Sequence, residues 1–168
     1  IKLNLMKKIY KDNEYMSIAS PILNHKEFMK TKQIVHHGST RFNHSVKVSY
    51  LAYKLSKMLG CDARTSVRAG VLHDFFLERD DKNIATETKM LIKHPSLAKQ
   101  NAITYFGVNE KEQNIIESHM FPISNVAPKS KEAWIVTLCD KIVAMFEGAY
   151  TAKAQITVWI LFLVNFVR

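Results

Sequence analysis

Glycine and proline are scarce in this chain, with five and four occurrences among 168 residues. Both interrupt regular secondary structure, so their scarcity, together with long stretches of helix-forming residues, favours helices of several turns. The alternation of apolar and polar residues between hairpin turns, which is typical of a β-sheet protein, does not stand out either. The sequence therefore predicts an all-α helical bundle, and its length fits a single domain over residues 1–168.

Cysteine is rare as well, and no long apolar run is present. Cys61 and Cys139 lie in apolar helical contexts without a Cys-x-x-Cys spacing, and we interpret them as two buried or half-buried thiols. The longest apolar run, residues 158–164, has seven residues, whereas a membrane-spanning helix needs about 20. No apolar segment follows the basic start, as it would in a signal peptide. We expect a cytoplasmic protein without membrane contact.

Acidic residues are outnumbered, 15 against 24 lysines and arginines, which gives a formal net charge of +9. The lysines are scattered, so most of them are expected on the solvated surface. The excess favours anionic partners, and phosphate-bearing small molecules fit it as well as nucleic acid does.

The spacing of apolar residues divides the chain into helices. Asn43 and Asp62 are candidate N-caps, and Gly60 and Gly107 are natural helix ends. The predicted helices are two short ones within residues 14–34 with a break near 21–24, and others at 44–59, 63–76, 94–106, from 109 or 110 onward, 132–148 and 152–167. Residues 78–89 are predicted to form a loop. The residues at 75–77 are expected to be exposed, and with the apolar segment at 159–166 they make a homodimer plausible.

The stretch Ala69-Gly70-Val71-Leu72-His73-Asp74 organises the chain, because an apolar helical run ends there in two metal-ligating residues. A buried carboxylate is costly unless a positive charge meets it, so this ending predicts a bound cation. Further candidate ligands lie on apolar helical stripes or at helix ends beside loops: His44, His94, His119 and Asp140.

Each of these six residues has an alternative explanation when taken alone. A histidine on an apolar face is more often a hydrogen-bonded core residue than a ligand, whereas a buried aspartate is rarer. Six such placements in one small helical domain favour a divalent metal site. Imidazole and carboxylate ligands suit Fe, Mn, Zn, Ni, Co or Mg, and the sequence does not choose among them.

The order of these residues resembles the signature of the HD superfamily of metal-dependent phosphohydrolases, an all-helical family. The resemblance covers about residues 14–147 and rests on Arg41-Phe42-Asn43-His44, His73-Asp74-Phe75-Phe76-Leu77 and Leu138-Cys139-Asp140-Lys141. The stretches at 119–122 and 128–134 resemble a little-studied bacterial branch of small, single-domain HD proteins. The apolar tail after Gly148 has no counterpart in this resemblance.

The resemblance implies that one divalent ion is held by His44, His73, Asp74 and Asp140. In members with two ions, Asp74 would bridge them, and His94 and His119 would hold the second ion. With a single ion, these two histidines would become substrate or proton-transfer residues.

Three further residues are candidates for binding the substrate. Arg41, one turn before His44, and Lys141, next to Asp140, are candidate catalytic and phosphate-binding residues alongside Asp74, although both could be ordinary solvated charges. His37 lies in the predicted loop before Arg41, and we expect it to reach the mouth of the site and contact the substrate.

The predicted function is hydrolysis of a small phosphate ester, such as a nucleotide. The chain lacks the Glu-Asp pair of HD enzymes that hydrolyse guanosine tetraphosphate, and the Gly-Tyr-Pro motif of the cyclic-dinucleotide branch. Two alternatives are a metal- and nucleotide-binding sensor without turnover, and a nucleic-acid-binding protein driven by charge. No RNA- or DNA-binding motif supports the latter.

Overall fold

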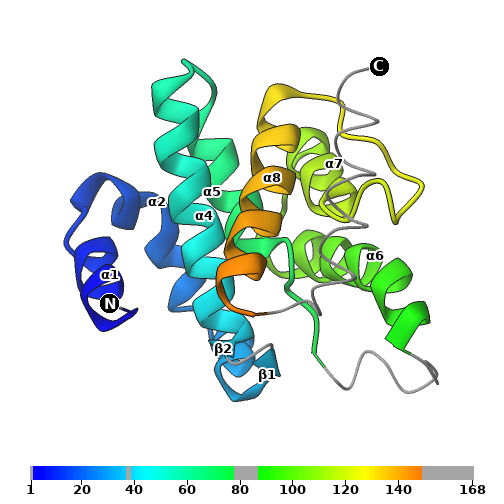
Figure 1. The fold of residues 1–168 in the computed structure, drawn as a ribbon, viewed down its shortest axis with the longest axis horizontal. Coiled ribbons are helices and arrows are strands. Elements are labelled where there is room, and N and C mark those ends of the chain that lie inside the picture. Colours follow the sequence, from blue (N-terminus) through cyan, green and yellow to red (C-terminus); the bar gives the residue numbers. More distant parts are fainter. Residues whose placement is uncertain (1, 37–38, 78–86, 149–168) are drawn as a thin grey trace.

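The computed structural model of the chain describes residues 2–36, 39–77 and 87–148 and confirms an all-α fold (Figure 1). Its helices are α1 (Lys2–Tyr10), α2 (Asn13–Leu23), α3 (Lys26–Met29), α4 (Arg41–Met58), α5 (Ala63–Leu72), α6 (Glu87–Phe106), α7 (Glu110–Ser118) and α8 (Lys131–Phe146), with a 3-10 turn at Lys30–Gln33. A minimal antiparallel hairpin of two-residue strands, β1 (Val35–His36) and β2 (Ser39–Thr40), precedes α4.

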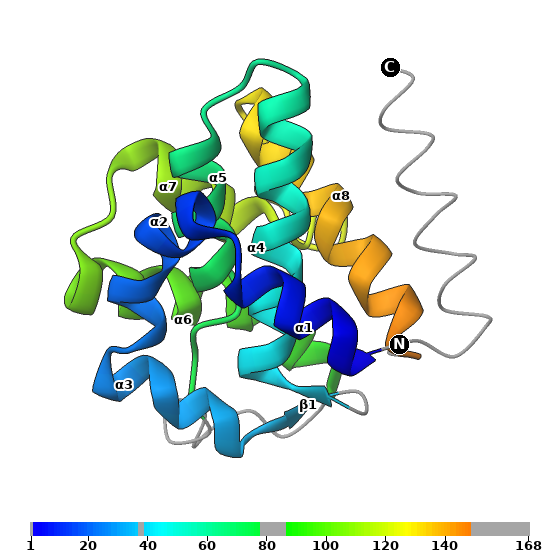
Figure 2. The ribbon, with the colours of Figure 1, turned by 90° about the vertical axis from the view of Figure 1, so that its left-hand side faces the viewer.

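Helices α4 and α5 form the centre of the bundle. Helix α4 packs against α5 and α8, whereas α5 also packs against α2 and α7, and α7 against α6. Two views at right angles both place α8 beside α4 (Figures 1 and 2). The close approach of α4 and α5 depends on Gly70, because a Cβ atom there would lie 3.0 Å from the Cα atom of Ser49.

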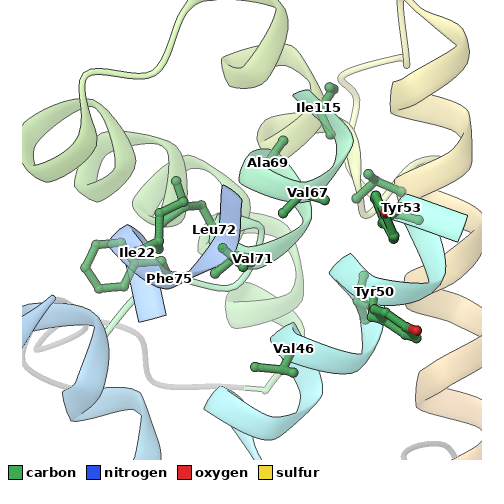
Figure 3. Packing of buried hydrophobic residues seen from close by; sticks show 14 of the residues in the cluster. Ile22, Val46, Tyr50, Tyr53, Val67, Ala69, Val71, Leu72, Phe75 and Ile115 are labelled. Carbon is green, nitrogen blue, oxygen red and sulfur yellow. The ribbon is translucent and has the colours of Figure 1, made fainter. Parts of the chain in front are cut away.

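The hydrophobic core lies between these central helices and their neighbours (Figure 3). Val46 and Tyr53 of α4 face Val67 and Val71 of α5, and all four are essentially inaccessible to solvent. Burial of each such side chain stabilises the fold by roughly 1.5–3 kcal/mol, so this contact fixes the position of α4 relative to α5.

Two prolines lie inside helices, and one of them led to a wrong helix boundary in the prediction. Helix α6 begins at Glu87, not at His94, and it continues through Pro95. Helix α2 also continues through Pro21, but it ends at Leu23, so the break predicted near residues 21–24 is present before α3. A proline removes one helical hydrogen bond, but tertiary packing can hold the helix together around it. In α6 that packing comes from Ala98 and Ala102.

The capping predictions were partly right. Asp62 caps α5, since its side chain accepts a hydrogen bond from the backbone N–H of Thr65. Helix α4 is capped by Thr40 instead of Asn43, because the helix begins earlier than predicted and Asn43 supplies the backbone N–H that Thr40 accepts. Helix α5 ends at Leu72, four residues before the predicted end at Phe76.

The expected exposure of residues 75–77 was also wrong. Phe75, Phe76 and Leu77 are all buried. The ring of Phe75 packs against Phe28, with a distance of 5.4 Å between ring centroids, and also contacts two aromatic rings of α6. These residues therefore offer no exposed apolar surface for a homodimer.

The C-terminal apolar helix predicted at 152–167 lies outside the described residues, and so does the homodimer contact expected from it. Within residues 2–36, 39–77 and 87–148, no helix has the length and apolar character needed to cross a membrane.

We expect the substitution Gly70→Ala to destabilise the protein. The new methyl group would press on the backbone of α4 at Ser49, and such overpacking costs roughly 1–3 kcal/mol, which outweighs the gain in helix propensity. Urea unfolding of the variant and the wild type measures this difference. A variant that is more stable than the wild type would show that α4 moves freely away from α5.

Candidate metal centre

All six predicted ligand residues meet at one buried place in the bundle. His44 comes from the first turns of α4, His94 from α6 and Asp140 from α8. His73 and Asp74 follow the last residue of α5, and His119 follows the last residue of α7. All six side chains are buried. Five separate segments of the chain thus converge on this centre.

The carboxylate of Asp74 lies between two groups of imidazole nitrogens. Its Oδ2 atom is 3.7 Å from Nε2 of His73. Its Oδ1 atom is 3.3 Å from Nε2 of His94 and 3.5 Å from Nε2 of His119. One carboxylate therefore directs an oxygen atom to each group.

The group on the Oδ2 side is completed by His44 and Asp140. Oδ1 of Asp140 is 3.0 Å from Nε2 of His44 and 3.6 Å from Nε2 of His73. On the Oδ1 side, the Nε2 atoms of His94 and His119 are 2.9 Å apart.

These distances match the spacing of ligands around a shared ion. Nitrogen and oxygen ligands bind zinc at about 2.0–2.2 Å, which places neighbouring tetrahedral ligand atoms about 3.3 Å apart. The ligand atoms of His44, His73 and Asp140 lie within 4.8 Å of one another, and so do those of His73, Asp74 and His119. The donor set therefore fits a divalent cation.

Helix ends fix the orientation of two of the imidazoles. Nδ1 of His73 is 2.8 Å from the carbonyl oxygen of Gly70, and Nδ1 of His119 is 2.7 Å from that of Ile116. A carbonyl oxygen only accepts, so each Nδ1 carries the proton and each Nε2 has a free lone pair when the ring is neutral. Carbonyl groups in the last turn of a helix lack helical partners, which makes them available for this bond.

His73 provides the clearest sign of an additional group in the centre. Its Nε2 atom is buried and has no hydrogen-bond partner among the described residues. A buried polar atom without a hydrogen-bond partner is uncommon in a folded protein and needs an explanation. A metal ion that accepts the lone pair of this Nε2 atom would provide one.

His44 has a different environment, because carboxylates meet both of its ring nitrogens. Its Nδ1 atom is 2.7 Å from Oε2 of Glu147, opposite the Asp140 contact at Nε2. Burial alone would lower the pKa of His44, but the hydrogen bonds to Asp140 and Glu147 outweigh burial and raise the pKa to about 10. Without a metal ion, the proton on His44 therefore supplies positive charge between the two carboxylates.

Asp74, Asp140 and His119 have pKa values that suit metal ligands. Burial would raise the pKa of Asp74, but the neighbouring histidines hold it well below its usual range. Burial also opposes ionisation of Asp140, and the ammonium group of Lys141 is the main influence that keeps its pKa well below the usual range. The pKa of His119 is lowered to about 4, chiefly by burial. Both carboxylates are thus ionised and His119 is neutral at pH 7.

The two predicted phosphate-binding cations are buried, which excludes their alternative interpretation as solvated surface charges. Lys141 donates to Oδ2 of Asp140 at 2.8 Å and to the carbonyl oxygen of His119 at 2.9 Å. The guanidinium group of Arg41 lies 3.6 Å from the ring centroid of Phe76 and donates to the Phe76 carbonyl oxygen. The third candidate, His37, lies outside the described residues.

Two residues that lie behind His44, Glu147 and Lys47, were not among the predicted site residues. The ammonium group of Lys47 forms an ion pair with Oε1 of Glu147. Two signals were present in the sequence: Glu147 lies about two helical turns after Asp140, and Lys47 lies about one turn after His44. Nothing in the sequence pairs these two positions, because the pairing depends on how α4 packs against α8.

In the metal-free protein, protonated His44 should stabilise the fold in a pH-dependent manner. Its folded pKa lies above the unfolded value, so the stabilisation is complete below about pH 6.5 and is lost as the pH rises toward about 10. We expect the free energy of unfolding of the wild type to fall across this window by on the order of a few kcal/mol relative to His44→Asn. Urea unfolding in a chelator at several pH values provides the test, and parallel pH profiles for the two proteins would contradict it.

Comparisons with known proteins agree with this centre. Residues 41–145 match the family model described as the HD domain, and this region contains all six ligand-type residues. The chain is 32% identical over 120 residues to a protein of Mesoplasma florum named ribonuclease Y. That match covers 71% of the chain but 22% of the relative, so the chain spans only about a fifth of its length. No solved structure matches the chain.

Proposed function

Because the chain belongs to the HD-domain family of metal-dependent phosphohydrolases, we propose that it hydrolyses a small phosphate ester, such as a nucleotide, at the centre described above. The observation that best supports this proposal is the division of the Asp74 carboxylate between two groups of imidazole nitrogens. That arrangement suits a pair of ions bridged by Asp74 better than it suits a single ion.

The two groups assign each ligand to a position. One ion would be held by His44, His73, Asp74 and Asp140, and the second by Asp74, His94 and His119. When bound, such ions lower the pKa of water toward neutrality and stabilise the charge that develops on a reacting phosphate. The identity of the metal is left open by these ligands.

The surrounding residues would prepare these ligands for the reaction. The carbonyl oxygens of Gly70 and Ile116 hold the protons of His73 and His119 at Nδ1, so that each Nε2 faces the centre. Lys141 has three partners within the protein, including the sulfur of Met120, so we propose that it acts through Asp140 and not by direct contact with phosphate.

Arg41 is the better candidate for a residue near the substrate. Its guanidinium group stacks on Phe76, whose ring lies 5.4 Å from the ring of His94. An arginine beside the second ligand group would favour an anionic ester over a neutral one. Among the cations described around the centre, we therefore assign Arg41 to phosphate binding.

A second candidate substrate is RNA. The relative from Mesoplasma florum carries the name ribonuclease Y, and the net charge of +9 suits a polyanion. The match leaves most of that relative uncovered, and hydrolysis of an RNA phosphodiester would use the same centre. We therefore place RNA second to a small phosphate ester.

Replacing Asp74 by asparagine should abolish metal binding at the bridged position. The amide keeps the shape of the carboxylate but removes the negative charge that faces both ligand groups. We expect metal affinity to fall by more than the roughly 100-fold that loss of an outer hydrogen-bond partner costs. Elemental analysis should find up to two ions per chain in the wild type and few or none in Asp74→Asn.

The matched control is Glu14→Gln, which makes the same chemical change at an exposed ion pair with Lys57. This control should retain the wild-type metal content. One ion in the wild type would leave His94 and His119 as substrate or proton-transfer residues. A wild type that binds no divalent ion under any loading condition would contradict the proposal.

The substrate class is tested by assaying metal-loaded protein against nucleotides, cyclic nucleotides, a chromogenic phosphate ester and single-stranded RNA. We expect release of phosphate or nucleotide from a small ester, with the activity lost in Asp74→Asn. Cleavage of RNA alone would favour the second candidate, with affinity that falls steeply as salt increases. Tight nucleotide binding without turnover would instead indicate a sensor.

A further inference from the structure

We propose that Glu147 is a positioning residue for His44, which orients that imidazole for metal binding without contacting the ion itself. This inference rests on the proposed metal centre and extends it to a residue outside the six ligands. Glu147 lies at the end of α8 and His44 near the start of α4, 103 positions apart in the sequence.

The contact between these residues is close and shielded from water. Oε2 of Glu147 is 2.7 Å from Nδ1 of His44, and the two side chains are only 3% and 2% exposed. Glu147 occupies the C-cap position of α8, and its backbone N–H donates to the carbonyl oxygen of Val143 at 3.0 Å. The helix end therefore holds the carboxylate in place.

The second oxygen of Glu147 is also occupied. Oε1 forms an ion pair with Lys47, which lies one turn after His44 on the same helix. Lys47 is in turn 3.5 Å from the hydroxyl group of Ser39 in β2. His44 and Lys47 of α4 thus bind the same carboxylate, one at each oxygen. The positive charge of Lys47 offsets the cost of burying the negative charge of Glu147.

This geometry determines which nitrogen of His44 faces the centre. A metal ion needs the lone pair of Nε2, so the proton of the neutral ring must lie on Nδ1. A carboxylate that accepts the Nδ1 proton fixes this tautomer and makes the imidazole a stronger ligand. His73 and His119 donate instead to neutral carbonyl groups, so Glu147 gives His44 a stronger acceptor.

A purely structural role for Glu147 is the main competing explanation, since its ion pair with Lys47 joins α4 to α8. The variant Lys47→Met separates the two roles, because it breaks that ion pair and leaves the hydrogen bond to His44. The variant Glu147→Ala removes both contacts. The variant Glu147→Gln keeps an oxygen acceptor for Nδ1 but removes the charge.

The experiment measures the dissociation constant for Zn²⁺ in the full chain by competition with a chromophoric chelator. We expect Glu147→Ala to bind Zn²⁺ about 10–100-fold more weakly than the wild type, as is typical for loss of such a partner. Glu147→Gln should recover part of this loss, and Lys47→Met should bind close to the wild-type value. Circular dichroism and urea unfolding of the metal-free variants show that each protein is folded.

A spectroscopic measurement adds a readout that a structural role would not change. In the Zn²⁺-loaded protein, the Nδ1 proton of His44 should give a downfield imidazole N–H resonance, because it is bonded to a buried carboxylate. This resonance should persist in Lys47→Met and disappear in Glu147→Ala.

The inference is overturned if Glu147→Ala binds Zn²⁺ as tightly as the wild type, or if Lys47→Met weakens binding equally. Either result would leave the proposed metal centre intact, because the wild type would still bind the ion. A wild type that binds no divalent ion would overturn the proposed function and this inference together.

Discussion

The buried carboxylate of Asp74 imposes the constraint on which the rest of this structure depends. It is almost inaccessible to solvent, lies among imidazole nitrogens and is nevertheless ionised. A buried negative charge of this kind is tolerated only where positive charge meets it. The convergence of His73, His94 and His119 on its two oxygens provides ligands for such a charge, and so a divalent ion explains both the carboxylate and the histidines around it.

Helix ends hold several of the candidate metal ligands in position. His73 and His119 each follow the last residue of a helix and donate to a carbonyl oxygen in its final turn. Gly70 serves twice, because it allows α5 to approach α4 at Ser49 and its carbonyl oxygen receives the His73 proton. The packing that fixes the two central helices therefore also fixes the ligands that they carry. His44 is held from behind at the end of α8, where Glu147 accepts its Nδ1 proton.

Local sequence pattern was enough to predict the helical fold and the candidate ligands, because apolar periodicity and polar residues within apolar stripes are short-range features. Predictions from local pattern failed where packing between distant segments determines helix boundaries and burial. Pro95 led to the prediction of a helix start, but α6 continues through this residue because the turns that follow it are buried against the core. Phe75 and Phe76 were expected to be exposed, yet contacts from α3, α4 and α6 cover them. The pairing of Glu147 with His44 joins a residue just beyond the end of the region that matches the HD-domain model to one near its start, and it has no local signature.

Anomalous scattering from crystals grown with Mn²⁺ tests the central claim most directly, because it locates each ion independently of any activity. We expect two peaks, one on either side of Asp74. The first should lie near His44, His73 and Asp140, and the second near His94 and His119. A single peak in the first group would restrict the centre to one ion. Crystals saturated with Mn²⁺ that show no peak at Asp74, with its contacts unchanged, would contradict the claim that this carboxylate is built around a metal.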